Sequence, residues 1–238
     1  GDNQPGDIDE LCEISDPDVG YITNIGKDHL AGYENGFEGN VASKAELFDY
    51  LRNHNRPVFV DRRDSLLMEL TQGMKQFLFG EQEEPNPSGI TESVFVTYRN
   101  PEGELKQTNL IGAYNLRNIE AAYAIARYFG VEVNKIDQAI TNYTPKNNRS
   151  QLLKTENNTL LMDAYNANPS SVSEALESFA KVGGDKVALL GDMLELGRES
   201  TKEHQEMIKL AHKLNISCLF VGEEYAKCKP TTLSKIFS

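Results

Sequence analysis

An acidic residue at the end of an apolar run is the first feature of the sequence that could do chemistry. Asp163 follows Leu160-Leu161-Met162, and Tyr165, Asn166, Asn168 and a helix-opening Pro169 come after it. A buried strand delivers polar groups to its carboxyl end, where α/β proteins bind ligands. The Asp163 carboxylate could therefore accept hydrogen bonds from both hydroxyls of a ribose. Upstream, Arg149 could neutralise the charge of a transferring phosphate. An ion pair between Arg149 and Asp163 is the structural alternative.

His29 and Lys44 form a second candidate pair. His29 lies in a loop just beyond an expected strand, and a neutral imidazole can bind a divalent ion. Lys44 begins a helix, so its tip could reach the same cleft. A protonated lysine would repel a metal, but a carbamylated lysine is a carboxylate and could bind magnesium through oxygen. A loop histidine and a solvated helix lysine are the alternative.

Asn115 and Asn118 stand three residues apart at an expected helix start, so both point toward one side. An amide offers a donor and an acceptor, which matches an adenine edge. A simple N-cap with a neighbouring surface amide would explain the same residues.

The segment 191–197 reads Gly-Asp-Met-Leu-Glu-Leu-Gly after a buried strand. Its two acids, Asp192 and Glu195, could hold a cationic amine. Considered by themselves, they are better interpreted as caps for the helix that follows.

The elements that would position these residues divide the chain at a linker, 143–148. Before it we expect strands at 20–26 and 57–61, a hairpin of 90–99 with 105–110, and helices at 8–15, 41–53, 65–76, 115–129 and 135–142. After it, strand and helix alternate over 159–164, 170–180, 186–190, 201–214 and 217–221. Helices of this length between buried strands imply parallel crossovers. The sequence therefore predicts an α/β protein with two domains.

Composition narrows the class of protein. The chain has 238 residues and a net charge of −12, which argues against a nucleic-acid partner. Three widely separated cysteines suit a reducing cytosol, and no stretch approaches the length of a membrane span.

Gly26-Lys27-Asp28 lacks the earlier glycine and the following Ser or Thr of a phosphate-binding loop. The sequence thus carries no phosphate-binding loop of its own.

Taken together, these stretches resemble the Mur ligase family. The residues that carry the resemblance are 22–26 with His29 and Leu30, Lys44 before Glu46 and Leu47, Asn115 with Asn118, Arg149, 163–169 and 191–197. Two positions depart from the family pattern. Tyr114 stands where histidine is common, and Ala31 replaces a common glutamate.

The resemblance implies a truncated central P-loop-type ATPase domain at 1–145 and a Rossmann-like C-terminal domain at 146–238, also truncated. It implies that ATP and Mg²⁺ are bound. His29 and carbamylated Lys44 would serve magnesium, and Asn115 and Asn118 the adenine. Arg149 would approach the phosphates and Asp163 the ribose, with Tyr165, Asn166 and Asn168 near the reacting centre.

The segments 163–169 and 191–197 resemble those of family members that add D-alanyl-D-alanine to UDP-N-acetylmuramoyl-tripeptide. We therefore expect a monomeric, cytoplasmic ligase of peptidoglycan synthesis that acts through an acyl phosphate, and no ligase activity from this chain alone. A sister ligase that adds a diamino acid and a non-catalytic nucleotide-binding module are the alternatives.

Overall fold

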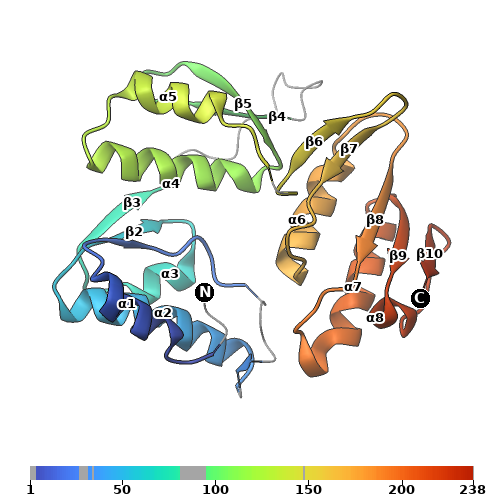
Figure 1. Ribbon diagram of the computed structural model, residues 1–238, viewed down its shortest axis with the longest axis horizontal. Coiled ribbons are helices and arrows are strands. Elements are labelled where there is room, and N and C mark those ends of the chain that lie inside the picture. Colours follow the sequence, from blue (N-terminus) through green and yellow to red (C-terminus); the bar gives the residue numbers. More distant parts are fainter. Residues whose placement is uncertain (1–3, 27–31, 34, 81–94, 147, 238) are drawn as a thin grey trace.

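The structure is a computed structural model, and it describes residues 4–26, 32–33, 35–80, 95–146 and 148–237. Figure 1 shows three groups of elements, of which the last, β6 to β10 with α6 to α8, is built from the C-terminal third of the chain. The helices and the parallel and antiparallel strands of the structure confirm the expected α/β class.

The first group is a parallel sheet in the order β1-β2-β3, formed by Gly20–Tyr21, Val58–Asp61 and Gln76–Phe79. The central strand β2 is buried along its whole length. Val58 and Val60 pack with Phe48 of α2 (Phe37–Asn53), whereas Phe59 packs with Ala121 of α4 (Tyr114–Tyr128). Side chains alternate between the two faces of a strand, so helices cover this sheet on both sides. The shorter helices α1 (Asp7–Ser15) and α3 (Ser65–Leu70) complete the group.

Helix α4 also covers a second sheet. Strands β4 (Phe95–Arg99) and β5 (Leu105–Ile111) form the expected antiparallel hairpin, which is packed with α4 and α5 (Val133–Asn142). Their shared core contains Val96, Tyr98, Leu116, Tyr123 and Ile136. Because α4 is common to both cores, its N-terminus is fixed relative to both sheets.

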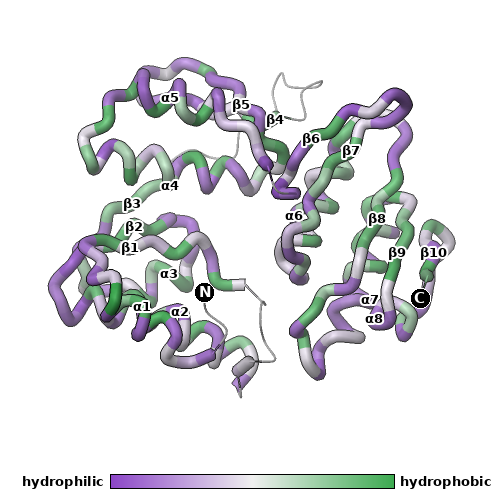
Figure 2. The backbone as a smooth tube through the Cα atoms, viewed as in Figure 1, coloured by the Kyte–Doolittle hydropathy of each residue, from purple (hydrophilic) through white to green (hydrophobic). Residues whose placement is uncertain are grey.

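The third group corrects two expectations. Strand β7 (Thr159–Met162) pairs antiparallel with β6 (Gln151–Lys154), so it is not the first strand of a parallel sheet as the alternating pattern predicted. Strand β7 is also not the buried strand that its apolar run indicated, because Thr159 and Leu160 are exposed and Leu161 and Met162 are half-buried. The parallel sheet consists of β8 (Val187–Gly191), β9 (Ser217–Val221) and β10 (Ser234–Phe237), and the strand order is β10-β9-β8. Strands β8 and β9 are mostly hydrophobic in Figure 2. The pattern of the sequence did not reveal β3, β6, β10 or the short helix α8.

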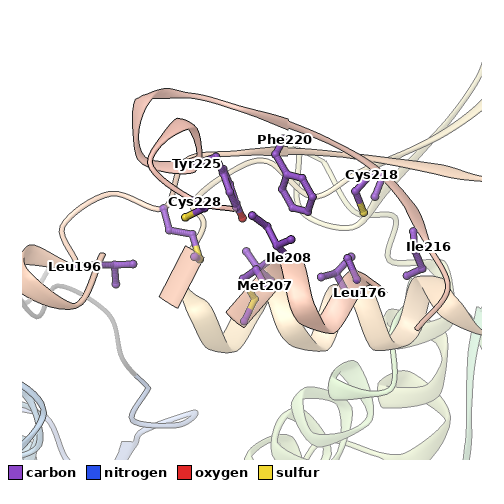
Figure 3. Packing of buried hydrophobic residues seen from close by; sticks show 13 residues of the cluster. Leu176, Leu196, Met207, Ile208, Ile216, Cys218, Phe220, Tyr225 and Cys228 are labelled. Carbon is purple, nitrogen blue, oxygen red and sulfur yellow. The ribbon is translucent and has the colours of Figure 1, made fainter. Parts of the chain in front are cut away.

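Helices α6 (Pro169–Ala180), α7 (Ser200–Lys213) and α8 (Glu223–Ala226) pack with this sheet. Leu176, Ile208, Phe220 and Tyr225 lie in the shared core, each at most 2% exposed. Figure 3 shows Tyr225 and Phe220 above the helices that carry Leu176 and Ile208. This core fixes the start of α6, and with it the segment that follows Asp163.

Candidate active site

Asp163 is held directly after β7 by the linker that precedes β6. The backbone N–H of Ser150 donates to Asp163 Oδ1 at 3.1 Å, and Ala164 N–H donates to the Asn148 carbonyl at 2.8 Å. Asn148 and Ser150 have φ angles of 59° and 47°, in the left-handed region that favours glycine. Such conformations cost on the order of 1 kcal/mol each and persist where the surrounding contacts fix them. Two residues just before β6 and two just after β7 are thus held together at the open end of the hairpin.

Tyr114 approaches the same carboxylate from helix α4. Its hydroxyl contacts Ser150 Oγ, and Gly112, at φ 93°, lies directly under the ring. A Cβ at Gly112 would sit 2.4 Å from a ring carbon of Tyr114, so only glycine admits this position of the ring. Tyr114 therefore joins the start of α4 to the linker beside Asp163.

Burial raises the pKa of Asp163, and the Ser150 N–H, the Tyr114 hydroxyl and the Arg149 charge act in the opposite direction. Burial also raises the pKa of Tyr114, which keeps the phenol neutral at ordinary pH. Asp163 is nevertheless exposed, so its fixed carboxylate can accept a hydrogen bond from a hydroxyl that reaches it.

Arg149 does not pair with Asp163. Its guanidinium carbon lies 3.6 Å from the centre of the Tyr165 ring, a cation–π contact, and both residues are exposed. Among the residues that the structure describes, no salt bridge within 4 Å joins Arg149 to Asp163, so the ion-pair alternative is wrong. The charge of Arg149 is instead presented at the surface on an aromatic face.

Asn115 and Asn118 are in contact with each other. Asn118 Nδ2 donates to Asn115 Oδ1 at 3.1 Å, and Asn115 Nδ2 donates to the Ile111 carbonyl at 2.7 Å. Asn115 lies inside α4 and is buried, while Ala113 occupies the N-cap position, so the simple N-cap alternative is wrong. Asn118 is exposed, one turn after Tyr114. Helix α4 thus brings an exposed carboxamide near the tyrosine that reaches Ser150.

The predicted metal ligands are only partly described. Lys44 lies in the second turn of α2 and is half-buried, and His29 lies outside the described residues. Nearby Glu46 accepts hydrogen bonds from the backbone N–H groups of Gly6 and Asp9 at 2.7 and 3.1 Å. No group of three His, Cys, Asp or Glu side chains gathers as metal ligands in the described ranges. A magnesium site at His29 and Lys44 stays a prediction.

Asn168 caps helix α6. Its Oδ1 accepts the Ser171 N–H at 2.8 Å, and the Asn168 N–H donates to Ser171 Oγ at 3.1 Å, with Pro169 as the first helical residue. This reciprocal pair is a capping box. Asn166, two residues earlier, is exposed. Of the three residues expected near a reacting centre, Asn168 therefore has an evident structural task, and Tyr165 has its contact with Arg149.

The prediction that the acids of the segment 191–197 cap the following helix is wrong, because Glu199 occupies the N-cap position of α7. Asp192 is instead the cap of a later helix. Its carboxylate accepts the N–H groups of Glu224 and Tyr225, both at 3.0 Å, and so caps α8. His204, fully buried in α7, accepts the Met193 N–H at Nε2 at 2.9 Å. Sequence reasoning did not single out His204. A lone histidine at an apolar helix position gave no signal of this role.

A cavity of about 400 Å³ lies between the first and third groups of elements. Ile25, Gly26 and Phe37 line one side of it. Pro169, Ser170, Ser173, Glu203 and Met207 line the other side. The end of the loop after β1 and the start of α6 therefore face one cavity, as expected for segments that share a site.

Known proteins match this chain in two consecutive parts. Residues 1–126 match the Mur ligase middle domain, and residues 148–235 match the Mur ligase, glutamate ligase domain. The UDP-N-acetylmuramoyl-tripeptide–D-alanyl-D-alanine ligase of Buchnera aphidicola is 29% identical over 231 residues, which cover 92% of this chain and 50% of that protein. The Bacillus subtilis ligase of the same name is 27% identical over 212 residues, 87% of this chain and 46% of that protein.

Solved structures agree with these matches. The crystal structure of MurF from Acinetobacter baumannii superimposes with a TM-score of 0.82 at 25% identity, covering 99% of this chain and 53% of that one. MurF from Thermotoga maritima, solved with ADP, gives 0.81 at 21% identity, over 99% and 56%, and supports the fold. The chain spans about half the length of the relatives it matches. By its middle-domain and C-terminal matches, the chain belongs to the Mur ligase family.

Proposed function

We propose that this chain is part of an ATP-dependent ligase that joins D-alanyl-D-alanine to UDP-N-acetylmuramoyl-tripeptide in peptidoglycan precursor synthesis. The observation that carries the proposal is the junction beside Asp163. Ser150 and Tyr114 join three segments there: the end of β7, the linker that carries Arg149, and the start of helix α4. The substrates of the proposal are taken from the names of the two ligases that this chain resembles.

The reaction has two steps. A terminal carboxylate oxygen of the tripeptide bonds to the γ-phosphorus of ATP, and ADP leaves with the electrons of the broken bridge. The amine of D-alanyl-D-alanine then attacks the acyl carbon, and phosphate leaves after the amine gives up a proton. Both steps change the charge on phosphoryl oxygens, which fixed cations stabilise.

In this proposal the nucleotide lies between the two parts of the chain, which we divide at 1–145 and 146–238. Asn118 and Asn115 face the adenine, Asp163 accepts the ribose hydroxyls, and Arg149 approaches the phosphates. Stacking on Tyr165 restricts the rotamers of the Arg149 guanidinium before any phosphate binds. The entropic cost of ordering this side chain on phosphate binding is therefore low. Tyr165 and Asn166 face the reacting centre, whereas Asn168 acts through the capping of α6.

Magnesium would neutralise phosphate oxygens, with His29 and carbamylated Lys44 as our proposed contacts. No group of three His, Cys, Asp or Glu side chains lies ready to bind a metal among the described residues. The roles given above to Asn118, Asp163 and Arg149 do not require the metal to be present. Labelling with ¹³C-bicarbonate tests the carbamate. We expect a carbamate carbon signal that disappears in Lys44→Arg, which keeps the charge of a lysine and cannot be carbamylated in the same way. A signal that survives this substitution would contradict the assignment.

No helix of the described residues is long and apolar enough to cross a membrane. We propose a cytoplasmic, monomeric enzyme, in keeping with a nucleotide-linked substrate.

The test of the function uses the longest gene product that contains these residues. Phosphate release from ATP should require both UDP-N-acetylmuramoyl-tripeptide and D-alanyl-D-alanine. Asp163→Ala should lower kcat/KM at least about tenfold, because a charged hydrogen-bond acceptor is lost. Asp185→Ala, an exposed aspartate before β8, is the matched control and should leave turnover unchanged.

Two outcomes would replace the proposal. Preference for a diamino acid over D-alanyl-D-alanine would identify a sister ligase. Nucleotide binding without any acceptor-dependent phosphate release would identify a non-catalytic module.

A further inference from the structure

We propose that Tyr114 is a positioning residue, which acts through Ser150 to fix the Asp163 carboxylate and to couple it to helix α4. Ser150 is the bridge between the two: its Oγ contacts the Tyr114 hydroxyl, and its backbone N–H donates to Asp163 Oδ1 at 3.1 Å. The inference rests on the proposed function, because it gives Asp163 a nucleotide to bind.

Either hydroxyl can be the donor in the contact between Tyr114 and Ser150. In both arrangements the contact restrains Ser150, whose backbone N–H donates to Asp163 Oδ1. Tyr114 is therefore connected to the carboxylate through Ser150, and the influence of its hydroxyl lowers the pKa of Asp163.

The backbone on both sides of the bridge is built to hold it. Ser150 adopts a φ of 47°, unfavourable for a residue with a side chain, and Gly112 at φ 93° leaves room for the Tyr114 ring. Ser150 is also 7% exposed, so its hydroxyl has little access to solvent. A strained, buried serine that satisfies one partner on each side is expected where orientation matters.

The bridge has a consequence for the nucleotide site. Tyr114 immediately precedes Asn115 in α4, so the residues proposed to face adenine and ribose are linked by a short chain of contacts. A carboxylate must be oriented to accept two ribose hydroxyls together. Without Tyr114, the Ser150 N–H alone would fix Asp163, and the carboxylate could rotate.

The charged groups around Asp163 are few, which makes its titration a clear measurement. Two groups favour the ionised form of Asp163: the charge of Arg149, from the linker, and the hydroxyl of Tyr114, from α4. Glu174 of α6 acts electrostatically on Tyr114, and Arg117 of α4 acts on Glu174. Removing the Tyr114 hydroxyl should thus change Asp163 while these other charges are kept.

The experiment measures the pKa of the Asp163 carboxyl by ¹³C NMR in the complete chain. Tyr114→Phe should raise this pKa by roughly half a unit or more, because a donor to the charged form is lost. Ser150→Ala keeps the backbone N–H but removes the hydroxyl that contacts Tyr114, so it should raise the pKa by a similar amount. Tyr225→Phe is the matched control: it removes a buried hydroxyl in α8 that has no hydrogen-bond partner among the described residues, and it should leave Asp163 unchanged.

Nucleotide affinity provides a second, separate readout. The wild-type chain should bind ADP more tightly than 2′,3′-dideoxy-ADP, and Tyr114→Phe should reduce that ratio about threefold. An unchanged Asp163 pKa in Tyr114→Phe would overturn the positioning role, whatever the chain binds. The Asp163 pKa could rise in Tyr114→Phe while the wild-type chain shows no preference for the ribose hydroxyls. That outcome would support the positioning of Asp163 and contradict the proposed nucleotide role.

Discussion

The guanidinium of Arg149 lies over the ring of Tyr165, with 3.6 Å between the guanidinium carbon and the ring centre. The two residues lie on either side of the β6–β7 hairpin, so the contact closes the open end of that hairpin on its exposed side. Arg149 is in this way presented to solvent, in a defined direction, without a carboxylate partner within 4 Å in the described part of the chain.

Tyr165→Ala should weaken ADP binding by the chain about two- to fivefold, because an exposed cation–π contact contributes roughly 0.5–1 kcal/mol. Tyr165→Phe keeps the aromatic face and should bind like the wild type. Titration calorimetry measures both, and the Arg149 side-chain NMR signal should lose its ring-current shift only in the alanine variant. Equal affinities with an altered Arg149 signal would show that the contact does not serve the nucleotide.

Asn168→Ala should lower the free energy of unfolding by about 1 kcal/mol through loss of the capping box of α6. Asn168→Asp keeps a side-chain acceptor and should retain most of the stability. Urea unfolding of both variants, with the exposed Asn166→Ala as control, measures this difference. If Asn168→Asp is as unstable as Asn168→Ala, the cap is not what Asn168 contributes.

Asp137 should make stability depend on pH. Burial acts to raise its pKa, but hydrogen bonds from Tyr98, Asn100 and Tyr123, at 2.6, 2.8 and 3.2 Å, outweigh it, and the pKa lies below its ordinary value. A lowered folded-state pKa gives stability that is complete above the unfolded pKa of about 4 and is lost as the pH falls through the folded value.

Asp137→Asn should therefore cost about 2 kcal/mol at pH 7, where a charged acceptor is lost. The difference from wild type should shrink as the pH falls below about 4, because the unfolded wild-type carboxyl then binds a proton before the folded one does. Unfolding in urea at several pH values tests this, with the exposed Asp185→Asn as control. A difference that stays constant with pH would contradict the assignment.

Gly222→Ala should destabilise the C-terminal sheet group by about 2 kcal/mol or more. Its φ is 133°, and an added Cβ would lie 2.2 Å from the Asp192 carboxyl carbon. Asp192→Ala should itself cost about 1 kcal/mol through loss of the α8 cap. In the double variant the clash disappears, so the two costs should not add. Gly183→Ala, with open space around it and no positive φ, is the control for a glycine substitution in thermal or urea unfolding.

The features that the sequence predicted well are local ones. The start of α6 was predicted from the helix-opening Pro169, although its capping box of Asn168 and Ser171 was not predicted. The hairpin of β4 and β5 is encoded by its turn. The core face of α4 follows from apolar residues three or four apart. In each case the residues that decide the structure lie within one or two turns of chain.

The features that were missed depend on distant contacts. The pattern could not show that β7 pairs with β6, because an apolar run is the same in parallel and antiparallel sheets. It also could not show that the first half of β7 is exposed. The helical pattern at 65–76 hid the end of α3 at Leu70 and the start of β3. Tyr114 was noted as a departure from the family, but only the fold brings it to Ser150, and only the fold shows that Arg149 turns to Tyr165.

The cap that Asp192 provides for α8 also bears on the order in which the chain acquires structure. The carboxylate and the N–H groups that it binds are more than thirty residues apart, at Glu224 and Tyr225. Closing so long a loop carries an entropic cost that neighbouring contacts in β8 and β9 must first offset. During synthesis, the loop after β8 consequently stays without its final partner until the ribosome has released the chain beyond Tyr225. The segment 191–197 is, in this respect, among the later parts of this group of elements to become native.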